Sequence, residues 1–165
     1  MLNKFLGACS AASLLLMVTA GTQADPRESW MASEIDGKSV LSFGVPDSPE
    51  EVTLVLTCEA SGGVELFIAR GSEKLKPGAS VDFTLSIGTA KSNFRGAALL
   101  NLLDGIPSVR AIGGYYEPVF QALTKGGTLL MMVGTEKTSI SLASFGKKAK
   151  TLWAKCKPED QPATP

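Results

Sequence analysis

The sequence predicts a mainly β fold: an antiparallel β-sandwich or open barrel with a short internal helix and a C-terminal helix clamped by one disulfide. Three observations support this prediction. Several short segments alternate apolar and polar residues between glycine-rich turns. A stripe of apolar residues with helical spacing follows near the C-terminus. One cysteine lies in an apolar strand segment and another on that stripe, so both thiols are expected to point inward.

The chain begins with the features of a secretory signal peptide. Lys4 precedes an apolar run from Phe5 to Val18, and small residues then lead to Ala24. A membrane-spanning helix is the alternative, but the run is shorter than the roughly 20 residues that a span needs. We therefore expect cleavage after Ala24, localisation in the periplasm or outside the cell, and no transmembrane segment in the mature chain.

The expected domain organisation follows from this leader. A mature chain of about 140 residues matches one ordinary domain. Three prolines in the last nine residues favour an unordered end. The expected parts are a signal peptide at 1–24, a single β-rich domain at 25–156 and a disordered tail at 157–165.

Alternation of apolar and polar residues predicts five strands in the first part of the domain. The segments are 30–35, 38–43, 52–58, 64–70 and 81–87. Asp36-Gly37 lies between the first two segments and tolerates the positive φ angles of a tight hairpin turn. The third segment ends in Cys58, and glycines after it predict a second hairpin with the fourth.

The second part of the domain mixes helix and strand patterns. Segment 93–103 suits either a strand or a helix, and glycine and proline end it at 105–107. The other predicted elements are a helix at 117–125, a strand at 128–133, a strand at 138–142 and a helix at 144–156. Because segment 128–133 is apolar on both faces, we expect it to be buried between two layers. Ser144 is the expected N-cap of the last helix.

The expected disulfide joins Cys58 to Cys156. Phe145, Ala149, Leu152 and Cys156 recur on one side of the last predicted helix. Removal of Cys9 with the leader leaves two cysteines in an oxidising compartment, where they are expected to pair. A redox-active or metal-binding pair is the alternative, but the two cysteines are far apart in the sequence and no histidine could complete a metal site.

The charge balance argues against binding to nucleic acid. The 16 basic residues equal the 16 acidic ones, and loss of Lys4 with the leader leaves a formal charge of −1. A nucleic-acid-binding domain would carry a basic patch and a clear positive excess. We therefore expect partners that are envelope or secreted proteins, or the glycan of the cell wall.

The absence of histidine removes the commonest general base and most nucleophile pairs. Catalysis would then need carboxylates, or Ser144 activated by Lys147 or Lys148. The acids that could form such a pair are Glu28, Glu34, Asp36, Glu50 and Glu51. Loop acids are more often solvated side chains, and Ser144 is explained as a cap. We expect no enzymatic activity and no cofactor or metal.

Two groups of residues are the candidate partner surface. Tyr115, Tyr116 and Glu117 follow two glycines, and adjacent tyrosines cannot both point to one face of a strand. At least one ring is therefore expected to be exposed, where aromatic side chains often anchor partners or sugars. The second group is formed by lysines of the last helix: Lys147, Lys148 and Lys150. A solvated helix face and a packed tyrosine are the alternatives.

The order of these features resembles a plan found in small exported bacterial proteins. A strand at 54–58 ends in cysteine. Segment 138–145 is a strand that leads into a turn, which ends with a small residue followed by Phe145, and the helix after this turn ends at Cys156. The ending is similar to that of the invasion-associated locus B family. The strand cysteine and post-helix cysteine are similar to those of VasI-type type VI secretion accessory proteins. The resemblance implies an exported β-protein that acts as an accessory, envelope or host-contact factor.

The expected function is therefore a periplasmic, non-enzymatic accessory or binding protein of the bacterial cell envelope. An inhibitor of a secreted hydrolase such as lysozyme is one alternative, because a rigid β-protein could present a loop to the enzyme. A host-interaction or virulence-associated secreted factor is another. A hydrolase that uses carboxylates and a disulfide-bonded structural subunit are further alternatives, and the sequence leaves the oligomeric state open.

Overall fold

The computed structural model describes residues 27–59, 62–102 and 104–158. The strands in these residues are β1 (Ser29–Ile35), β2 (Lys38–Gly44), β3 (Val52–Cys58), β4 (Gly63–Ile68), β5 (Ser80–Ile87), β6 (Ala90–Leu99), β7 (Ser108–Gly114), β8 (Thr128–Val133) and β9 (Glu136–Ser141). The helices are α1 (Pro118–Ala122) and α2 (Lys147–Ala154), with short 3₁₀ helices at η1 (Pro49–Glu51) and η2 (Leu123–Lys125).

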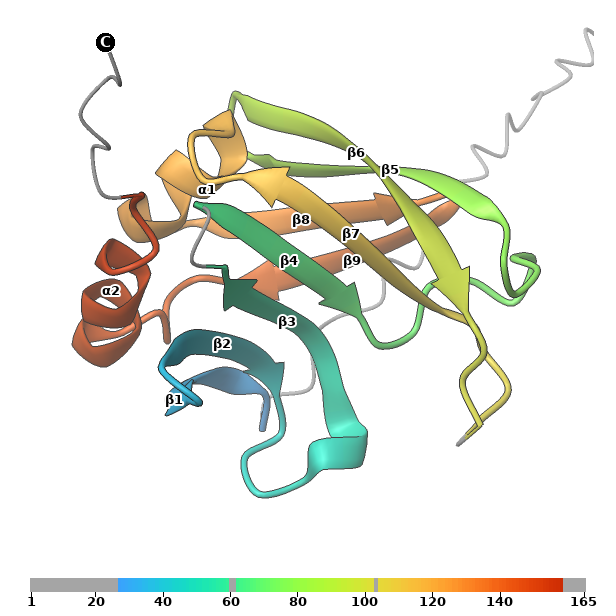
Figure 1. Ribbon diagram of the computed structural model, residues 1–165, viewed down its shortest axis with the longest axis horizontal. Coiled ribbons are helices and arrows are strands. Elements are labelled where there is room, and N and C mark those ends of the chain that lie inside the picture. Colours follow the sequence, from blue (N-terminus) through green and yellow to red (C-terminus); the bar gives the residue numbers. More distant parts are fainter. Residues whose placement is uncertain (1–26, 60–61, 103, 159–165) are drawn as a thin grey trace, which may run out of the picture.

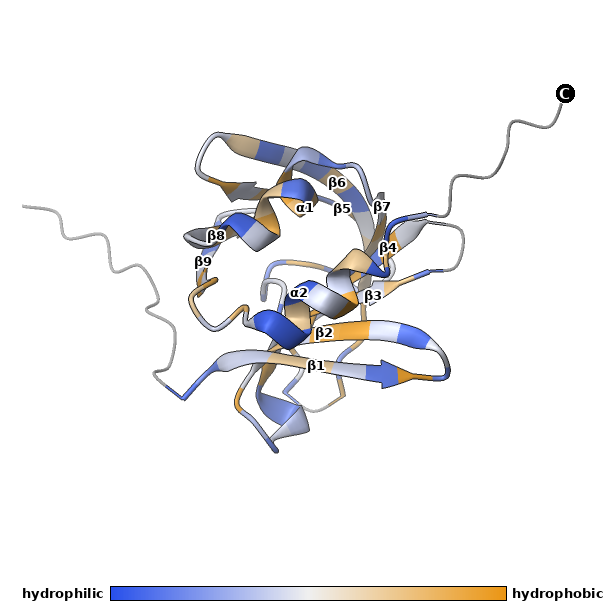
Figure 2. Ribbon diagram, turned by 90° about the vertical axis from the view of Figure 1, so that its left-hand side faces the viewer, coloured by the Kyte–Doolittle hydropathy of each residue, from blue (hydrophilic) through white to orange (hydrophobic). Residues whose placement is uncertain are grey.

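All nine described strands belong to one antiparallel sheet that curls into a half-barrel (Figure 1). The strand order along the sheet is β1-β2-β3-β4-β7-β6-β5-β8-β9. Figure 2 shows α1 and α2 at one end of the curled sheet, in front of the strands. The predicted mainly β fold with a short internal helix and a C-terminal helix is confirmed, and it takes the form of an open barrel.

The predicted hairpins form, with small shifts at the ends of their strands. Asp36 and Gly37 join β1 to β2 with φ angles of 50° and 75°, which a type I′ turn requires. β3 pairs with β4, and β8 pairs with β9, both antiparallel. The predicted helix at 117–125 is divided into α1 and η2.

Two strands of the sheet, β6 and β7, are not clearly predicted from the alternation of apolar and polar residues. Residues 93–99 of the ambiguous segment 93–103 belong to β6, residues 100–102 lie outside the sheet, and residue 103 lies outside the described residues. β7 has no predicted counterpart, although it pairs with both β4 and β6. Its inward positions include Ala111 and Gly113, which are too small to produce a clear apolar alternation.

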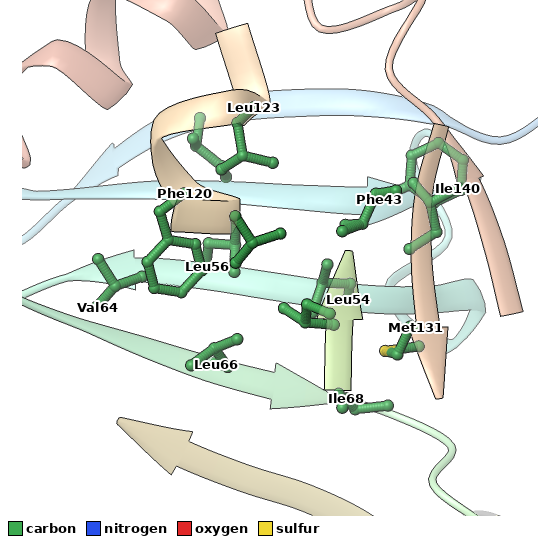
Figure 3. Packing of buried hydrophobic residues seen from close by; sticks show 14 of the residues in the cluster. Phe43, Leu54, Leu56, Val64, Leu66, Ile68, Phe120, Leu123, Met131 and Ile140 are labelled. Carbon is green, nitrogen blue, oxygen red and sulfur yellow. The ribbon is translucent and has the colours of Figure 1, made fainter. Parts of the chain in front are cut away.

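The core fills the inner face of the curled sheet. Figure 3 shows Phe120, from α1, beside Leu56 and Val64 on the neighbouring strands β3 and β4. All three side chains are almost fully buried. Burial of an aliphatic or aromatic side chain of this size contributes about 1.5–3 kcal/mol, so the α1–η2 segment is held to the sheet mainly by its apolar residues.

The prediction that segment 128–133 is buried on both faces is wrong. Leu129, Met131 and Val133 face the core, but Leu130 is only half-buried and Met132 is exposed. The reason is that one sheet forms the whole barrel wall, so the outer side of β8 faces solvent. Apolar residues on both faces therefore do not indicate two covering layers here.

The C-terminal helix packs against β1 and β2 and is bonded covalently to the sheet. Phe145, Ala149, Leu152 and Cys156 are all buried, as the spacing predicts. Cys58 and Cys156 form the expected disulfide, with their Cα atoms 5.1 Å apart. This bond connects the end of β3 to the residue that follows the last turn of α2.

The expectation that Ser144 caps the last helix is wrong. The helix begins later, at Lys147, and Gly146 occupies the cap position. The Ser144 hydroxyl instead accepts a hydrogen bond of 3.1 Å from the backbone N–H of Trp30, and the Trp30 indole donates to the Ser141 carbonyl at 3.0 Å. These bonds connect edge strand β1 to the turn after the other edge strand, β9, so Ser144 helps to hold the two edges together.

The expected signal peptide at 1–24 lies outside the described residues. Of the expected tail at 157–165, only Lys157 and Pro158 are described. No helix in the described part of the chain has the length and apolar character to cross a membrane.

Replacing both cysteines, Cys58→Ala with Cys156→Ala, is expected to lower the free energy of unfolding by about 4–5 kcal/mol. The reason is that the bond links residues 98 positions apart and restricts the unfolded chain. Urea denaturation under oxidising conditions measures the change. Dithiothreitol should destabilise the natural chain by a similar amount and leave the double variant unchanged. Equal urea midpoints for the two proteins without reductant would contradict this prediction.

Candidate partner-binding site

The two tyrosines of the predicted surface have different environments. The Tyr115 ring is half-buried and packs against Trp153 of α2, with the ring centroids 5.5 Å apart. The Tyr116 side chain is 60% exposed and meets Tyr115 edge-on. Tyr115 therefore supports the structure, and Tyr116 is the ring available to a partner.

The glycines before the tyrosines have a packing role. A Cβ atom on Gly113 would lie 2.5 Å from the Phe94 ring, closer than packing allows. Gly113 thus lets the Phe94 ring approach β7. The Tyr115 carbonyl also accepts a hydrogen bond of 2.7 Å from the Gln121 side chain, so α1 holds the loop in place.

The lysines of the predicted surface lie on the outside of α2. Lys147, Lys148 and Lys150 are exposed, whereas Trp153 faces inward and contacts Tyr115. Lys147 and Lys150 line a shallow hollow together with Phe145 and Thr151, and neither tyrosine contributes to it. Glu117 is half-buried at the start of α1, where its carbonyl accepts the backbone N–H groups of Phe120 and Gln121. The structure therefore brings the tyrosine loop beside α2, and a partner-binding role for both stays a prediction.

Three of the candidate catalytic acids contact different structural partners instead of one another. Lys155 contacts Glu34 at 3.1 Å, and Arg27 contacts Glu51 at 3.4 Å. Glu28 accepts a hydrogen bond from Thr53 at 2.9 Å. Among the described residues, no group of histidine, cysteine or carboxylate side chains could hold a metal ion.

A second candidate site lies on the outer side of the sheet. It is a groove of about 700 Å³, which we call the leucine groove. Its apolar lining includes Val55, Phe67, Leu99, Leu100 and Leu102, and its charged lining residues are Glu50, Arg70 and Asp104. Leu100 is 64% exposed and Leu102 is 85% exposed.

The floor of the leucine groove comes from outward positions of two paired strands. Val55 of β3 lies directly opposite Phe67 of β4, and both are half-buried. Their neighbours along the chain, such as Leu54 and Leu66, are fully buried in the core. The same two strands therefore contribute apolar side chains to both faces of the sheet.

One wall of the groove is the β6–β7 arm, which comprises residues 99–102 and 104–107. Figure 1 shows this connection extending beyond the sheet. Gly105, with φ of 76°, donates its N–H to the Asn101 carbonyl at 3.2 Å. The Asp104 side chain accepts the Ile106 N–H at 2.9 Å and contacts Arg70 at 2.8 Å. Local bonds and an ion pair to the end of β4 therefore determine the shape of the arm.

The other wall is formed by Pro49 and Glu50 of η1 and by Val52, the first residue of β3. Pro49 begins η1, and the Glu51 carbonyl accepts the Val45 N–H at 3.1 Å. Gly44 lies so close to Glu51 and Val52 that a side chain there would collide with their backbone. In the described residues, both walls thus have defined backbone conformations.

Two features of the sequence indicate the leucine groove, although the predicted strands do not depend on either of them. Val55 and Phe67 are large apolar residues at positions that should face solvent. Leu99, Leu100 and Leu102 come just before a glycine and a proline, where a polar loop is usual. Neither observation places the two groups together, because the contact between them depends on the position of β7 between β4 and β6.

A row of polar pairs covers the outer face of β5 and β6. Arg95 contacts Asp82 with both ends of its guanidinium, at 2.8 and 3.2 Å. The hydrogen bond from Arg95 lowers the pKa of the Asp82 carboxyl below its ordinary value. Thr84 donates to the Asn93 side chain at 2.9 Å. Because these side chains pair with one another across the strands, they stabilise the register of β5 and β6.

No protein-family model, curated protein or solved structure matches this chain. The resemblance to the invasion-associated locus B family and to VasI-type proteins therefore stays a prediction.

The two tyrosines are expected to differ in their effect on stability. Tyr115→Ala removes the ring that packs on Trp153 and should lower the free energy of unfolding by about 1–3 kcal/mol. Tyr116→Ala, the matched control at an exposed site, should change it by less than about 0.5 kcal/mol. Urea denaturation of both variants measures the difference. A larger loss for Tyr116→Ala than for Tyr115→Ala would contradict this assignment.

Proposed function

We propose that this chain is an exported, non-enzymatic accessory protein that binds another protein of the bacterial cell envelope through the leucine groove. The observation that carries the proposal is the exposure of Leu100 and Leu102 beside an apolar floor formed by Val55 and Phe67. Single exposed leucines are common on protein surfaces, but a contiguous apolar patch usually marks a binding surface.

The energetics support binding at this place. Covering apolar surface contributes roughly 25 cal/mol for each Å² removed from water. The leucines stay exposed in the folded chain, so covering them with a partner would stabilise the complex. Because local hydrogen bonds and the Arg70–Asp104 ion pair already order the arm, little conformational entropy is lost when a partner binds.

The composition of the leucine groove supports binding rather than catalysis. The carboxylate of Asp104 is paired with Arg70, and the hydroxyl of Ser108 belongs to a buried residue. The chain has no histidine to activate that hydroxyl. A partner with a complementary apolar surface is the ligand that these residues fit.

A second candidate function is inhibition of a secreted hydrolase such as lysozyme. It is favoured by the exposed Tyr116 ring, which contacts Tyr115, and by the packing of Tyr115 on Trp153 of α2, the helix that carries the exposed lysines. A tyrosine with nearby cations suits an enzyme cleft that contains carboxylates. Assays of cell-wall hydrolysis with several lysozymes test this function. Inhibition that Tyr116→Ala abolishes would support it, and no inhibition of any enzyme would exclude it for those enzymes.

The main proposal is tested by photo-crosslinking in living cells. A photo-reactive amino acid in place of Leu100 is expected to give a discrete adduct with one envelope protein, because this position lines the leucine groove. The same amino acid in place of Ile35 is the matched control, since Ile35 is 54% exposed but does not line the groove. Mass spectrometry identifies the adduct.

Equal or absent adducts at positions 100 and 35 would contradict binding through the leucine groove. An adduct with a second copy of this chain would also contradict the proposal, because it would make the groove a contact between subunits. Thermal unfolding of both labelled proteins checks that the substitutions leave the fold intact.

A further inference from the structure

We propose that the leucine groove binds a short, extended apolar segment of its partner that carries a lysine or arginine, and that this cation pairs with Glu50. This inference rests on the proposed function, because it names the chemistry of the partner at the same site. Three observations support it: the size of the groove, the pairing of its charges, and the poorer charge complementarity of other apolar ligands.

The size of the groove suits a peptide segment. Its volume of about 700 Å³ lies within the range of roughly 300–1,000 Å³ that is usual for ligand sites. The floor is formed by paired strands, and the β6–β7 arm and η1 stand on either side. An extended segment can place alternate side chains on the apolar floor and keep the remaining ones in solvent.

The charges of the groove favour a cationic partner. Arg70 and Asp104 neutralise each other across 2.8 Å, and Asp104 also accepts the Ile106 N–H. The carboxylate of Glu50 is exposed and has no hydrogen-bond or ion-pair partner among the described residues. The groove therefore keeps one unpaired negative charge, and a partner with a cation beside its apolar residues is electrostatically complementary.

Other apolar occupants fit these charges less well. A second copy of this chain, docked groove to groove, would bring a second Glu50 and no unpaired cation. A fatty acid would bring a carboxylate to a groove in which Arg70, the one guanidinium among the described lining residues, already pairs with Asp104. Like charges at a contact are a strong source of discrimination against a partner. The unpaired charge thus selects against these occupants.

Selection from a phage-displayed library of random short peptides tests the inference. The protein used is the mature chain with its disulfide intact. We expect the selected peptides to combine large aliphatic residues with lysine or arginine. A synthetic copy of the most enriched peptide should bind Leu100→Asp at least about tenfold more weakly than the natural chain. The matched control, Ile35→Asp, should bind it with unchanged affinity.

The role of Glu50 is tested by reversing its charge. Glu50→Lys is expected to weaken binding of the selected peptide by about tenfold. A peptide in which glutamate replaces the cation should show the opposite preference and bind Glu50→Lys better than the natural chain. Thermal unfolding confirms that the exposed substitutions at positions 50 and 100 leave the protein folded.

Several outcomes would overturn the inference. These are selected peptides without a cation, peptides that bind Leu100→Asp and the natural chain equally, and an affinity that does not respond to the charge at position 50. Self-association that Leu100→Asp abolishes, measured by sedimentation, would assign the groove to a second copy instead. If these tests fail while position 100 still crosslinks to an envelope protein, binding through the groove stands and only the peptide chemistry is wrong.

Discussion

A sheet that curls without closing leaves part of its inner face uncovered, and the structure depends on how that face is sealed. Here α2 packs against β1 and β2, and the bond between Cys58 and Cys156 joins it to β3. Trp30 adds two hydrogen bonds to the turn after β9. The two edge strands are thus connected through Ser141 and Ser144, which lie before α2, and the side chains that Figure 3 shows pack in a mainly apolar core.

The features that the sequence could predict depend mainly on residues that are close together in the chain. The inward side of α2 is encoded locally, since it follows from residue spacing within one element. The disulfide could be predicted because only two cysteines follow the expected leader. The β1–β2 turn is local too, because Asp36-Gly37 suits a type I′ turn almost independently of its surroundings. These features are confirmed by the structure.

The features that could not be predicted depend on contacts between distant parts of the chain. β7 is held by pairing on both sides, and its small inward residues give it little pattern of its own. Ser144 has a residue type that suits a helix cap, but Trp30 recruits its hydroxyl from the far end of the chain. Met132 is exposed because the barrel wall is a single sheet, which the composition of one strand cannot reveal.

The candidate sites show the same division. The exposure of one tyrosine follows from two adjacent rings, although only the contact with Trp153 identifies Tyr116 as the exposed one. The leucine groove joins β3 and β4 to an arm that follows β6, so it exists only through the sheet order. Its parts are visible in the sequence, but their proximity is a property of the topology.

The β6–β7 arm has an internal architecture that is largely separate from the core. Its turn is set by Asn101, Asp104 and Gly105, and Figure 1 places it away from α2. Its exposed leucines contribute little to folding, so the loop can acquire new side chains at small cost to the barrel. A loop of this kind is a natural point for diversification, both in evolution toward other targets and in the engineering of binding reagents on this framework.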